Sequence, residues 1–315
     1  MASIMTNASA LTALQSLNAT NKSLETTQGR ISTGFRVATA ADNAAYWSIA
    51  TTMRSDNKAN SVVQDALGLG AGKVDTAYTA INKAIEVVDK IKQKVLLAKT
   101  SESADRAKIQ SEIDTYISQL KDNIGGASYA GTNMLKTGST ATDATKLSII
   151  TSYNRDSAGK VTTGQIDVTL SNVRLMNTVA ATKDGVLDKA GAASTKSILE
   201  IDVSDLTGVT GYTAGDANTE GAAFDNLLTD IESALKSMAT GAAELGAAKA
   251  RVDLQKDFVS SLSDAIDKGV GQLVDADMNK ESTRLQALQV QQQLGIQALS
   301  IANGNSQSIL SLFRG

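Results

Sequence analysis

Apolar side chains recur at alternating intervals of three and four residues through much of the chain, which is the spacing of a heptad seam on an α-helix. The first seam, near the N-terminus, consists of Leu14, Leu17, Asn21, Leu24, Gln28, Ile31 and Phe35. A second seam runs from Val74 to Val95, and a third, shorter one runs from Ile109 to Ile124. The pattern therefore predicts three helical arms before the middle of the chain.

The spacing changes between about Leu135 and Glu220, where Thr, Ser, Gly and Asp become frequent. In "GQIDVTLSNVRL", Ile166, Val168 and Leu170 alternate with polar residues and share one face of an extended strand. The segment "SILEIDVSDL" repeats this alternation. We therefore expect a small β-containing domain inserted between helical arms.

Helical spacing returns near Ala222 and continues to the end of the chain. One seam there repeats at strict intervals of seven, through Leu245, Val252, Val259, Ile266 and Leu273. Several heptad arms on both sides of an insertion most simply close as an antiparallel bundle. The predicted fold class is mainly α, with a long antiparallel helical bundle or coiled coil of the N- and C-terminal arms and an inserted small α+β outer domain.

The two ends of the chain carry no charged side chains, over residues 1–21 and again over residues 285–313. A monomeric bundle usually keeps a charged outer face, which maintains its solubility. Helices with apolar residues on one side and Gln, Asn, Ser and Thr on the others can instead be covered by neighbouring subunits, because amides bury at lower cost than charges. The neutral ends therefore predict self-assembly, and disorder of these ends in the isolated monomer.

The composition narrows the possible chemistry. The chain contains no Pro, Cys or His, only 3% aromatic residues, and a net charge of −3. Without Cys and His, disulfides, thiol chemistry and the commonest general base are excluded, and the mixed charges give no footprint for nucleic acid or an anionic membrane. The N-terminus lacks the basic and apolar regions of a cleaved signal peptide, and the C-terminal tail is too polar to span a bilayer.

The best candidate for a ligand motif is "GLGAGK", residues Gly68 to Lys73. A phosphate-binding loop needs Gly where Leu67 stands and Ser or Thr where Val74 stands, so we expect a flexible turn between helices instead. The carboxylate pairs Asp264/Asp267 and Asp275/Asp277 are expected to be solvated charges on helices. We therefore predict no catalytic residues, no cofactor and no metal site, and thus a protein that is not an enzyme.

Two terminal segments resemble the bacterial flagellins, particularly those of α-proteobacteria such as the rhizobia and their relatives. Near the N-terminus the matching residues are Ser32, Gly34, Arg36, Asp42, Ala44 and Ala45. Near the C-terminus they are Asp275, Ala276, Asp277, Glu281, Gln293, Gly295, Leu299, Ala302, Asn303 and Leu310. The chain departs from the common family pattern at Arg36-Val37-Ala38, Asp42-Asn43 and Tyr46-Trp47.

The resemblance implies a structural subunit that self-polymerises into the extracellular flagellar filament for swimming motility. It implies a filament-core helix at residues 1–40, inner-wall helices at 41–135, a variable outer domain at 136–220, an inner-wall helix at 221–275 and a second filament-core helix at 276–315. The implied partners are other copies of the chain, hook-associated junction and filament cap proteins, an export chaperone and the flagellar type III export apparatus, which exports flagellins without a cleaved signal peptide. Nucleic acid and membrane are not among them.

In the filament core, Leu14, Leu17, Leu24 and Ile31 are expected to pack against Leu285, Leu288, Leu299 and Ile309. Arg30, Arg36 and Asp42 are candidates for polar contacts between subunits, for fixing the turn near residues 36–43, or for local salt bridges. Two other functions stay open from the residues alone. One is a hook-filament junction protein, and the other is a secreted binding module such as an adhesin held on a helical stalk.

Overall fold

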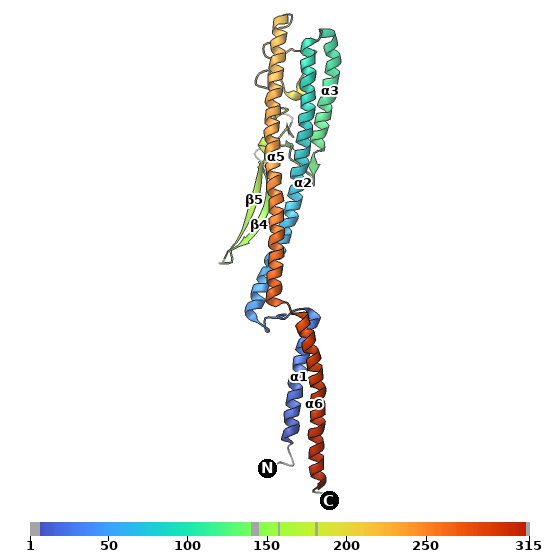
Figure 1. The fold of residues 1–315 in the computed structure, drawn as a ribbon. Coiled ribbons are helices and arrows are strands. Elements are labelled where there is room, and N and C mark those ends of the chain that lie inside the picture. The colour runs from blue at the N-terminus through green and yellow to red at the C-terminus, as the bar shows by residue number, and fades with distance from the viewer. Residues whose placement is uncertain (1–6, 140–144, 157, 180–181, 313–315) are drawn as a thin grey trace. The chain divides into compact units, whose positions relative to one another are not determined.

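The computed structural model describes residues 7–139, 145–156, 158–179 and 182–312, without the side chains of 217, 218 and 305–312. Its helices are α1 (Ala8–Thr33), α2 (Ala44–Thr100), α3 (Ser103–Gly126), the short α4 (Leu170–Val173), α5 (Ala217–Val274) and α6 (Met278–Leu312) (Figure 1). The strands are β1 (Ser128–Tyr129), β2 (Thr132–Asn133), β3 (Lys136–Thr137), β4 (Lys146–Arg155), β5 (Val161–Thr169) and β6 (Met176–Asn177). The predicted fold class, mainly α with a strand-containing insertion, is confirmed.

The chain forms two compact units. One unit consists of residues Ala59–Leu262, and the other combines Met1–Lys58 with Ser263–Gly315. The long helices α2 and α5 contribute residues to both. The roles that the resemblance implies for the five predicted segments stay a prediction.

The unit 59–262 has a continuous apolar core between α2, α3 and α5. The predicted seam of α2 is buried at Val74, Ile81, Val88 and Val95, and that of α5 at Leu245, Val252 and Val259. Ion pairs of Lys92 with Glu232 and of Lys94 with Glu112 connect α2 to α5 and to α3 at the surface. The heptad spacing thus predicted which helical faces are buried.

The prediction of a flexible turn at Gly68–Lys73 is wrong, because these residues lie inside the uninterrupted helix α2. A Cβ atom at Gly70 would lie 2.6 Å from Cγ2 of Ile149, and one at Gly72 would lie 2.6 Å from Cζ of Tyr129. The glycines therefore provide room for β4 and β1 to approach the helix. Tertiary packing outweighs the low helix propensity of glycine, which is about 1 kcal/mol less favourable than alanine.

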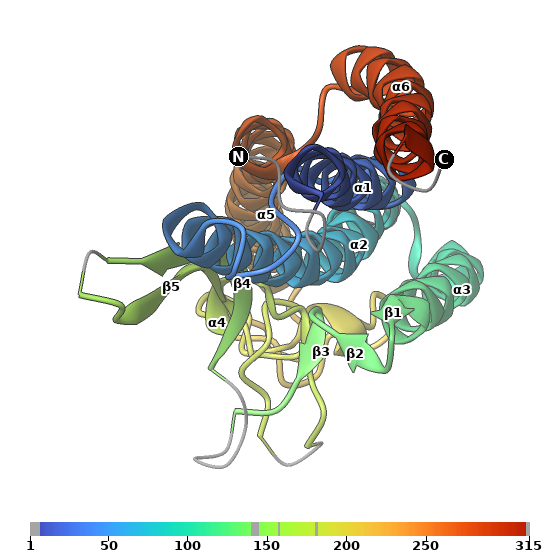
Figure 2. The same cartoon turned by 90° about the horizontal axis from the view of Figure 1, so that it is seen from below.

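The segment between α3 and α5 contains three sheets of two strands among the described residues. Strands β4 and β5 pair antiparallel with an irregularity between Ile150 and Ser152, and lie beside α2 in Figure 2. Strands β1 and β2 also pair antiparallel, whereas β3 and β6 pair in parallel. The predicted strand around Ile166 and Val168 is confirmed, with both side chains buried.

The alternation in "SILEIDVSDL" does not form a strand. Ile198–Glu200 is a single 3₁₀ turn, and irregular chain follows it. The side chain of Gln110 on α3 donates to the carbonyl of Ile201 at 3.0 Å and accepts from the N–H of Val203 at 2.8 Å. An amide from a helix therefore satisfies the backbone groups that a neighbouring strand would otherwise pair.

Candidate assembly surface

The unit formed by the two chain ends has α1 and α6 paired antiparallel. Asn7 Nδ2 donates to the carbonyl of Ala302 at 2.9 Å at one end of the pair. Gln292 Nε2 donates to Asn21 Oδ1 at 2.8 Å in the middle. Figures 1 and 2 both show the two helices side by side. The predicted meeting of the first arm with the last is thus present in the structure of one chain.

Local signals fix where these helices begin and end. Asn7 caps α1 by accepting from the N–H of Ala10 at 3.0 Å, and Gly34 ends the helix in the left-handed conformation with φ of 75°. Asp277 begins α6 by accepting from the N–H groups of Asn279 and Lys280. Capping side chains and a C-terminal glycine are the usual terminators of helices.

The contact between α1 and α6 is made of small and polar side chains as well as leucines. Leu17, Leu24 and Ile31 are half-buried on α1, while Leu285 and Leu299 are half-buried and Leu288 is buried on α6. A Cβ atom at Gly295 would lie 3.2 Å from Cδ1 of Leu17, so glycine permits close approach there. The side chain of Ile309 lies outside the described residues.

Leu14 lies away from the seam, with 44% of its surface exposed. Asn21 and Gln28 are exposed as well, and the buried side chain at this level of α1 is Thr27. Ala13 and Thr20, one position earlier than predicted, are half-buried. The face of α1 that contacts α6 is therefore rotated by one residue from the predicted face, toward the small residues Ala13, Thr20 and Thr27. A search for apolar residues does not find them, but their regular interval of seven residues could have indicated this face.

Each of the three candidate polar residues has a partner within the chain. Arg30 forms an ion pair with Glu281 at 3.3 Å, and Arg36 Nη2 donates to the carbonyl of Leu273 at 3.0 Å. Asp42 accepts from the N–H groups of Ala38 and Thr39 and from the Thr39 hydroxyl at 2.9–3.1 Å. Contacts of these residues with other subunits stay a prediction.

The hydrogen bonds at Asp42 lower its pKa below the ordinary value of 3.8. The largest cause is the backbone N–H of Thr39, followed by the Thr39 hydroxyl, with smaller help from Ala38 and the positive charge of Arg30, while partial desolvation opposes them. The carboxylate is therefore the form that stabilises the turn leading into α2.

The connection between α1 and α2 is bonded to the end of α5, which belongs to the same unit. The N–H groups of Arg36 and Val37 donate to the carbonyl of Val274 at 2.7 and 3.2 Å. Val37, Ala50, Val270 and Val274 form a small buried cluster beneath them. The connection between α1 and α2 is thus a defined structure held by both backbone bonds and apolar contacts.

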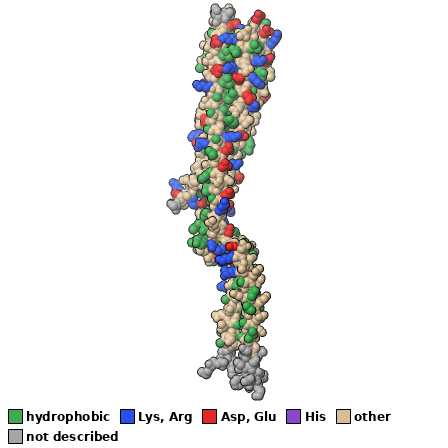
Figure 3. Space-filling view, in the orientation of Figure 1, with side chains coloured by type: hydrophobic (Ala, Val, Ile, Leu, Met, Phe, Trp, Pro, Cys, Tyr) green, Lys and Arg blue, Asp and Glu red, His purple; other side chains and the backbone are tan. Residues whose placement is uncertain are grey.

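Over the described side chains of residues 7–21 and 285–304, the outer face of the α1–α6 hairpin is uncharged and partly apolar. In Figure 3 the visible face of this hairpin shows mainly hydrophobic and uncharged side chains. On these uncharged stretches the exposed large apolar side chains are Leu11, Leu14, Val290, Leu294, Ile296 and Ile301. Exposed apolar surface on this scale usually marks an interaction site.

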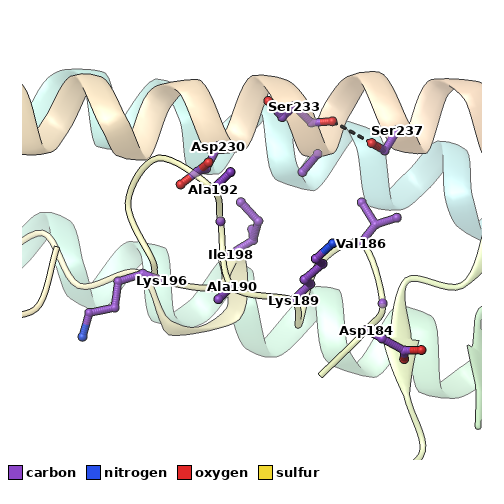
Figure 4. A pocket seen from close by; sticks show the side chains of 13 residues that line it. Asp184, Val186, Lys189, Ala190, Ala192, Lys196, Ile198, Asp230, Ser233 and Ser237 are labelled. Carbon is purple, nitrogen blue, oxygen red and sulfur yellow. Dashed lines mark hydrogen bonds between the residues drawn. The ribbon is translucent and has the colours of Figure 1, made fainter. Parts of the chain in front are cut away.

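The described residues contain no group of three or more His, Cys, Asp and Glu side chains that could hold a metal ion, and no helix among them is long and apolar enough to cross a membrane. A cavity of about 340 Å³ lies between the loop at 184–198 and α5. Asp230 turns toward that loop (Figure 4) and accepts from the N–H groups of Ala193 and Ser194, so its carboxylate holds the loop in place.

A strand-containing insertion between long helices, with a terminal hairpin that is uncharged over residues 7–21 and 285–312, is the architecture of a helical structural protein of the self-assembling kind. Residues 4–140 match the bacterial flagellin N-terminal helical region, and residues 228–313 match the bacterial flagellin C-terminal helical region. The chain belongs to the bacterial flagellins, whose members self-assemble into filaments, and is a structural subunit of the extracellular flagellar filament.

Relatives match over the whole chain. The sequence is 53% identical to a flagellin of Brucella melitensis biotype 1 and 48% identical to flagellin C of Rhizobium meliloti, covering 100% of each chain in both cases. The fold is similar to a solved putative flagellar hook-associated protein from Vibrio parahaemolyticus, with a TM-score of 0.50 and 13% identity over 74% of this chain and 100% of that one. The resemblance inferred from the terminal motifs is confirmed.

Proposed function

We propose that copies of this chain pack through the outer faces of their α1–α6 hairpins to form the filament core. The observation that carries the proposal is the coincidence of two features in one hairpin. It exposes six large apolar side chains, and residues 1–21 and 285–313 contain no charged residue. Burying such a surface gains about 25 cal/mol per Å² of apolar area and desolvates no charge.

Within each copy, Leu17, Leu24 and Ile31 with Leu285, Leu288 and Leu299 hold the hairpin together. Leu14 then serves contacts between copies, because it is exposed in the single chain. Arg30, Arg36 and Asp42 set the geometry of the hairpin base through their contacts with Glu281, Leu273 and the 38–39 turn. Ile309 extends the C-terminal helix of the core.

Membership of the family supports expectations about the proteins that export the chain and complete the filament. We expect the chain to reach the filament through the flagellar type III export apparatus with an export chaperone, without a cleaved signal peptide. We expect hook-associated junction proteins and a cap protein at the two ends of the filament. The work of the protein is mechanical, so we expect no catalytic turnover.

Electron microscopy of polymerisation tests the proposal. The purified chain is seeded with short filament fragments, beside a variant that lacks residues 1–21 and 285–315. Long tubes from the full chain and none from the truncated variant are the expected result. Growth of normal tubes by the truncated variant would overturn the proposal, and a full chain limited to short rings would favour a junction protein.

A further inference from the structure

Three large apolar side chains are exposed together at the start of α2. Tyr46, Trp47 and Ile49 have 41%, 38% and 49% of their surfaces exposed. The Trp is the only one in the chain. Aromatic residues at the surface are the ones most enriched at the energetic centres of protein interfaces.

Other residues start α2 and anchor its first turns. Asn43 starts α2 by accepting from the backbone N–H of Tyr46 at 3.1 Å, which any residue except proline can donate. The helix is anchored by Ala50, which is buried, and by the partly buried Met53. Tyr46, Trp47 and Ile49 lie outside that cluster, and the exposed parts of their side chains are open to contact with another copy.

We call Tyr46, Trp47 and Ile49 the aromatic corner. The arginines near it already have partners within the chain. Arg36 lies over the ring of Tyr46 at 6.0 Å and donates to the carbonyl of Leu273. Arg54 lies over the ring of Phe35 at 4.8 Å. A neutral partner could therefore cover the aromatic corner while each guanidinium keeps its contact, which lowers the cost of burial.

We propose that Tyr46, Trp47 and Ile49 dock onto the outer face of the α1–α6 hairpin of a second copy. The inference rests on the proposed function and names one of its contacts. Filaments need a contact between two different surfaces of the same chain, because a contact of one patch with itself closes as a dimer. Within residues 1–58 and 263–315, the other concentrated apolar surface is the hairpin face that carries Val290, Leu294 and Ile301.

The chemistry of the two surfaces is complementary. Ten of the twenty exposed large apolar side chains in the described residues belong to this unit, six on the hairpin, three at the corner, and Met278. Exposed glutamines at 289, 291 and 293 flank this face of α6 and can pair with the indole N–H and the phenol hydroxyl. An aromatic corner on a neutral, amide-rich helix buries apolar area without leaving a charge unpaired.

Trp47 reports directly on the contact, because no other Trp contributes to the fluorescence. We expect its emission to shift to shorter wavelength on polymerisation of the unmodified chain, with acrylamide quenching reduced at least about threefold. Unchanged emission and quenching in filaments that electron microscopy shows to be intact would overturn this inference and leave the proposed function standing. A chain that does not polymerise would overturn both.

A matched pair of variants tests the energetic role. Trp47→Lys is expected to raise the critical concentration for polymerisation at least about tenfold. Ser55→Lys adds the same charge to the same helix on another face, at an exposed position, and should leave the critical concentration within about twofold. Circular dichroism of both monomers verifies the helices. Equal effects of the two variants would contradict the inference.

Disulfide cross-linking identifies the partner surface, since the chain has no native Cys. A double variant, Ile49→Cys with Leu294→Cys, is oxidised as monomer and as filament. Leu294 lies 17 residues beyond Asp277, roughly 25 Å along α6, so a bond within one chain is out of reach. A ladder of dimers, trimers and longer species in filaments alone is the expected result. Products that stop at the dimer, or no products, would overturn the proposed pairing.

Discussion

Asp42 is the residue with the most specific local role, because its carboxylate holds the turn that leads into α2. Its hydrogen bonds with Ala38 and Thr39 lower its pKa below 3.8 in the folded chain. A lowered folded pKa means that the stabilisation is present above pH 3.8 and is lost as the pH falls through the folded value.

We therefore predict that Asp42→Asn weakens the 36–43 turn at neutral pH and has progressively less effect as the medium becomes more acidic than pH 3.8. An NMR titration of the Asp42 carboxyl gives its pKa directly, and urea unfolding at several pH values gives the difference in stability. A measured pKa at or above 3.8, or a difference that grows on acidification, would contradict the assignment.

Glu281 forms an ion pair with Arg30 between α6 and α1. Its side chain is 9% exposed, and one oxygen pairs with Arg30, while Oε2 has no hydrogen-bond partner in the described residues. Arg30→Met removes the cation and leaves the buried carboxylate unpaired. We expect a loss of about 1–3 kcal/mol in the stability of the hairpin.

The matching double variant, Arg30→Met with Glu281→Gln, removes the charge as well and should recover part of that loss. Hydrogen exchange of the first turns of α6 measures the stability of this region. A double variant as unstable as the sum of the single variants would show that the two side chains do not interact.

At the scale of elements, substitution of two glycines in α2 distinguishes the effect of helix propensity on stability from the effect of packing. Gly70 faces the buried Ile149, whereas Gly72 faces the ring of the exposed Tyr129. We expect Gly70→Ala to destabilise the unit 59–262 by about 1–3 kcal/mol, because Ile149 has little room to move. Gly72→Ala should be neutral or stabilising by up to about 1 kcal/mol, because Tyr129 can rotate away and alanine favours helix.

Urea unfolding followed by circular dichroism compares the two alanine variants. Adding Ile149→Val to Gly70→Ala should restore part of the stability by removing one of the clashing methyl groups. If Gly72→Ala proves the more damaging change, the described contact between α2 and β4 does not govern the packing.

At the scale of the whole molecule, the α1–α6 hairpin buries little by itself. Thr27 is the buried side chain of α1, and Leu288 and Glu281 are the buried ones among the described side chains of α6. Ordering each residue costs about 1–2 kcal/mol of backbone entropy, so an isolated hairpin is marginal. In the proposed filament core, neighbouring copies supply the missing burial and raise stability by mass action.

Limited proteolysis should therefore remove the chain ends from monomers and spare them in filaments, while the unit 59–262 resists in both. Mass spectrometry of the fragments locates the cuts. Ends that resist protease equally in the monomer would show that the hairpin is stable without neighbours.

The order of elements and the buried faces in the unit 59–262 followed from the sequence because heptad spacing reports directly on which side of a long helix is covered. The family also followed from the sequence, since the terminal motifs lie at both ends of a chain without proline. The pairing of the two terminal helices was also predicted from the sequence. The contact residues on α1 were predicted from its apolar side chains alone, and this prediction missed Ala13, Thr20 and Thr27. Small side chains pack closely without contributing much hydrophobicity, so their role depends on the partner helix.

The sequence by itself determined a helical, self-assembling chain with neutral ends, because period, composition and charge are local properties that each residue carries with it. Tertiary structure alone decided that Gly68–Lys73 stays helical, that "SILEIDVSDL" forms no strand and that Arg30, Arg36 and Asp42 find partners within the chain. These outcomes depend on contacts with residues distant in sequence, such as Ile149, Gln110 and Glu281. Local patterns contain no information on which distant side chain fills a space or satisfies a backbone group.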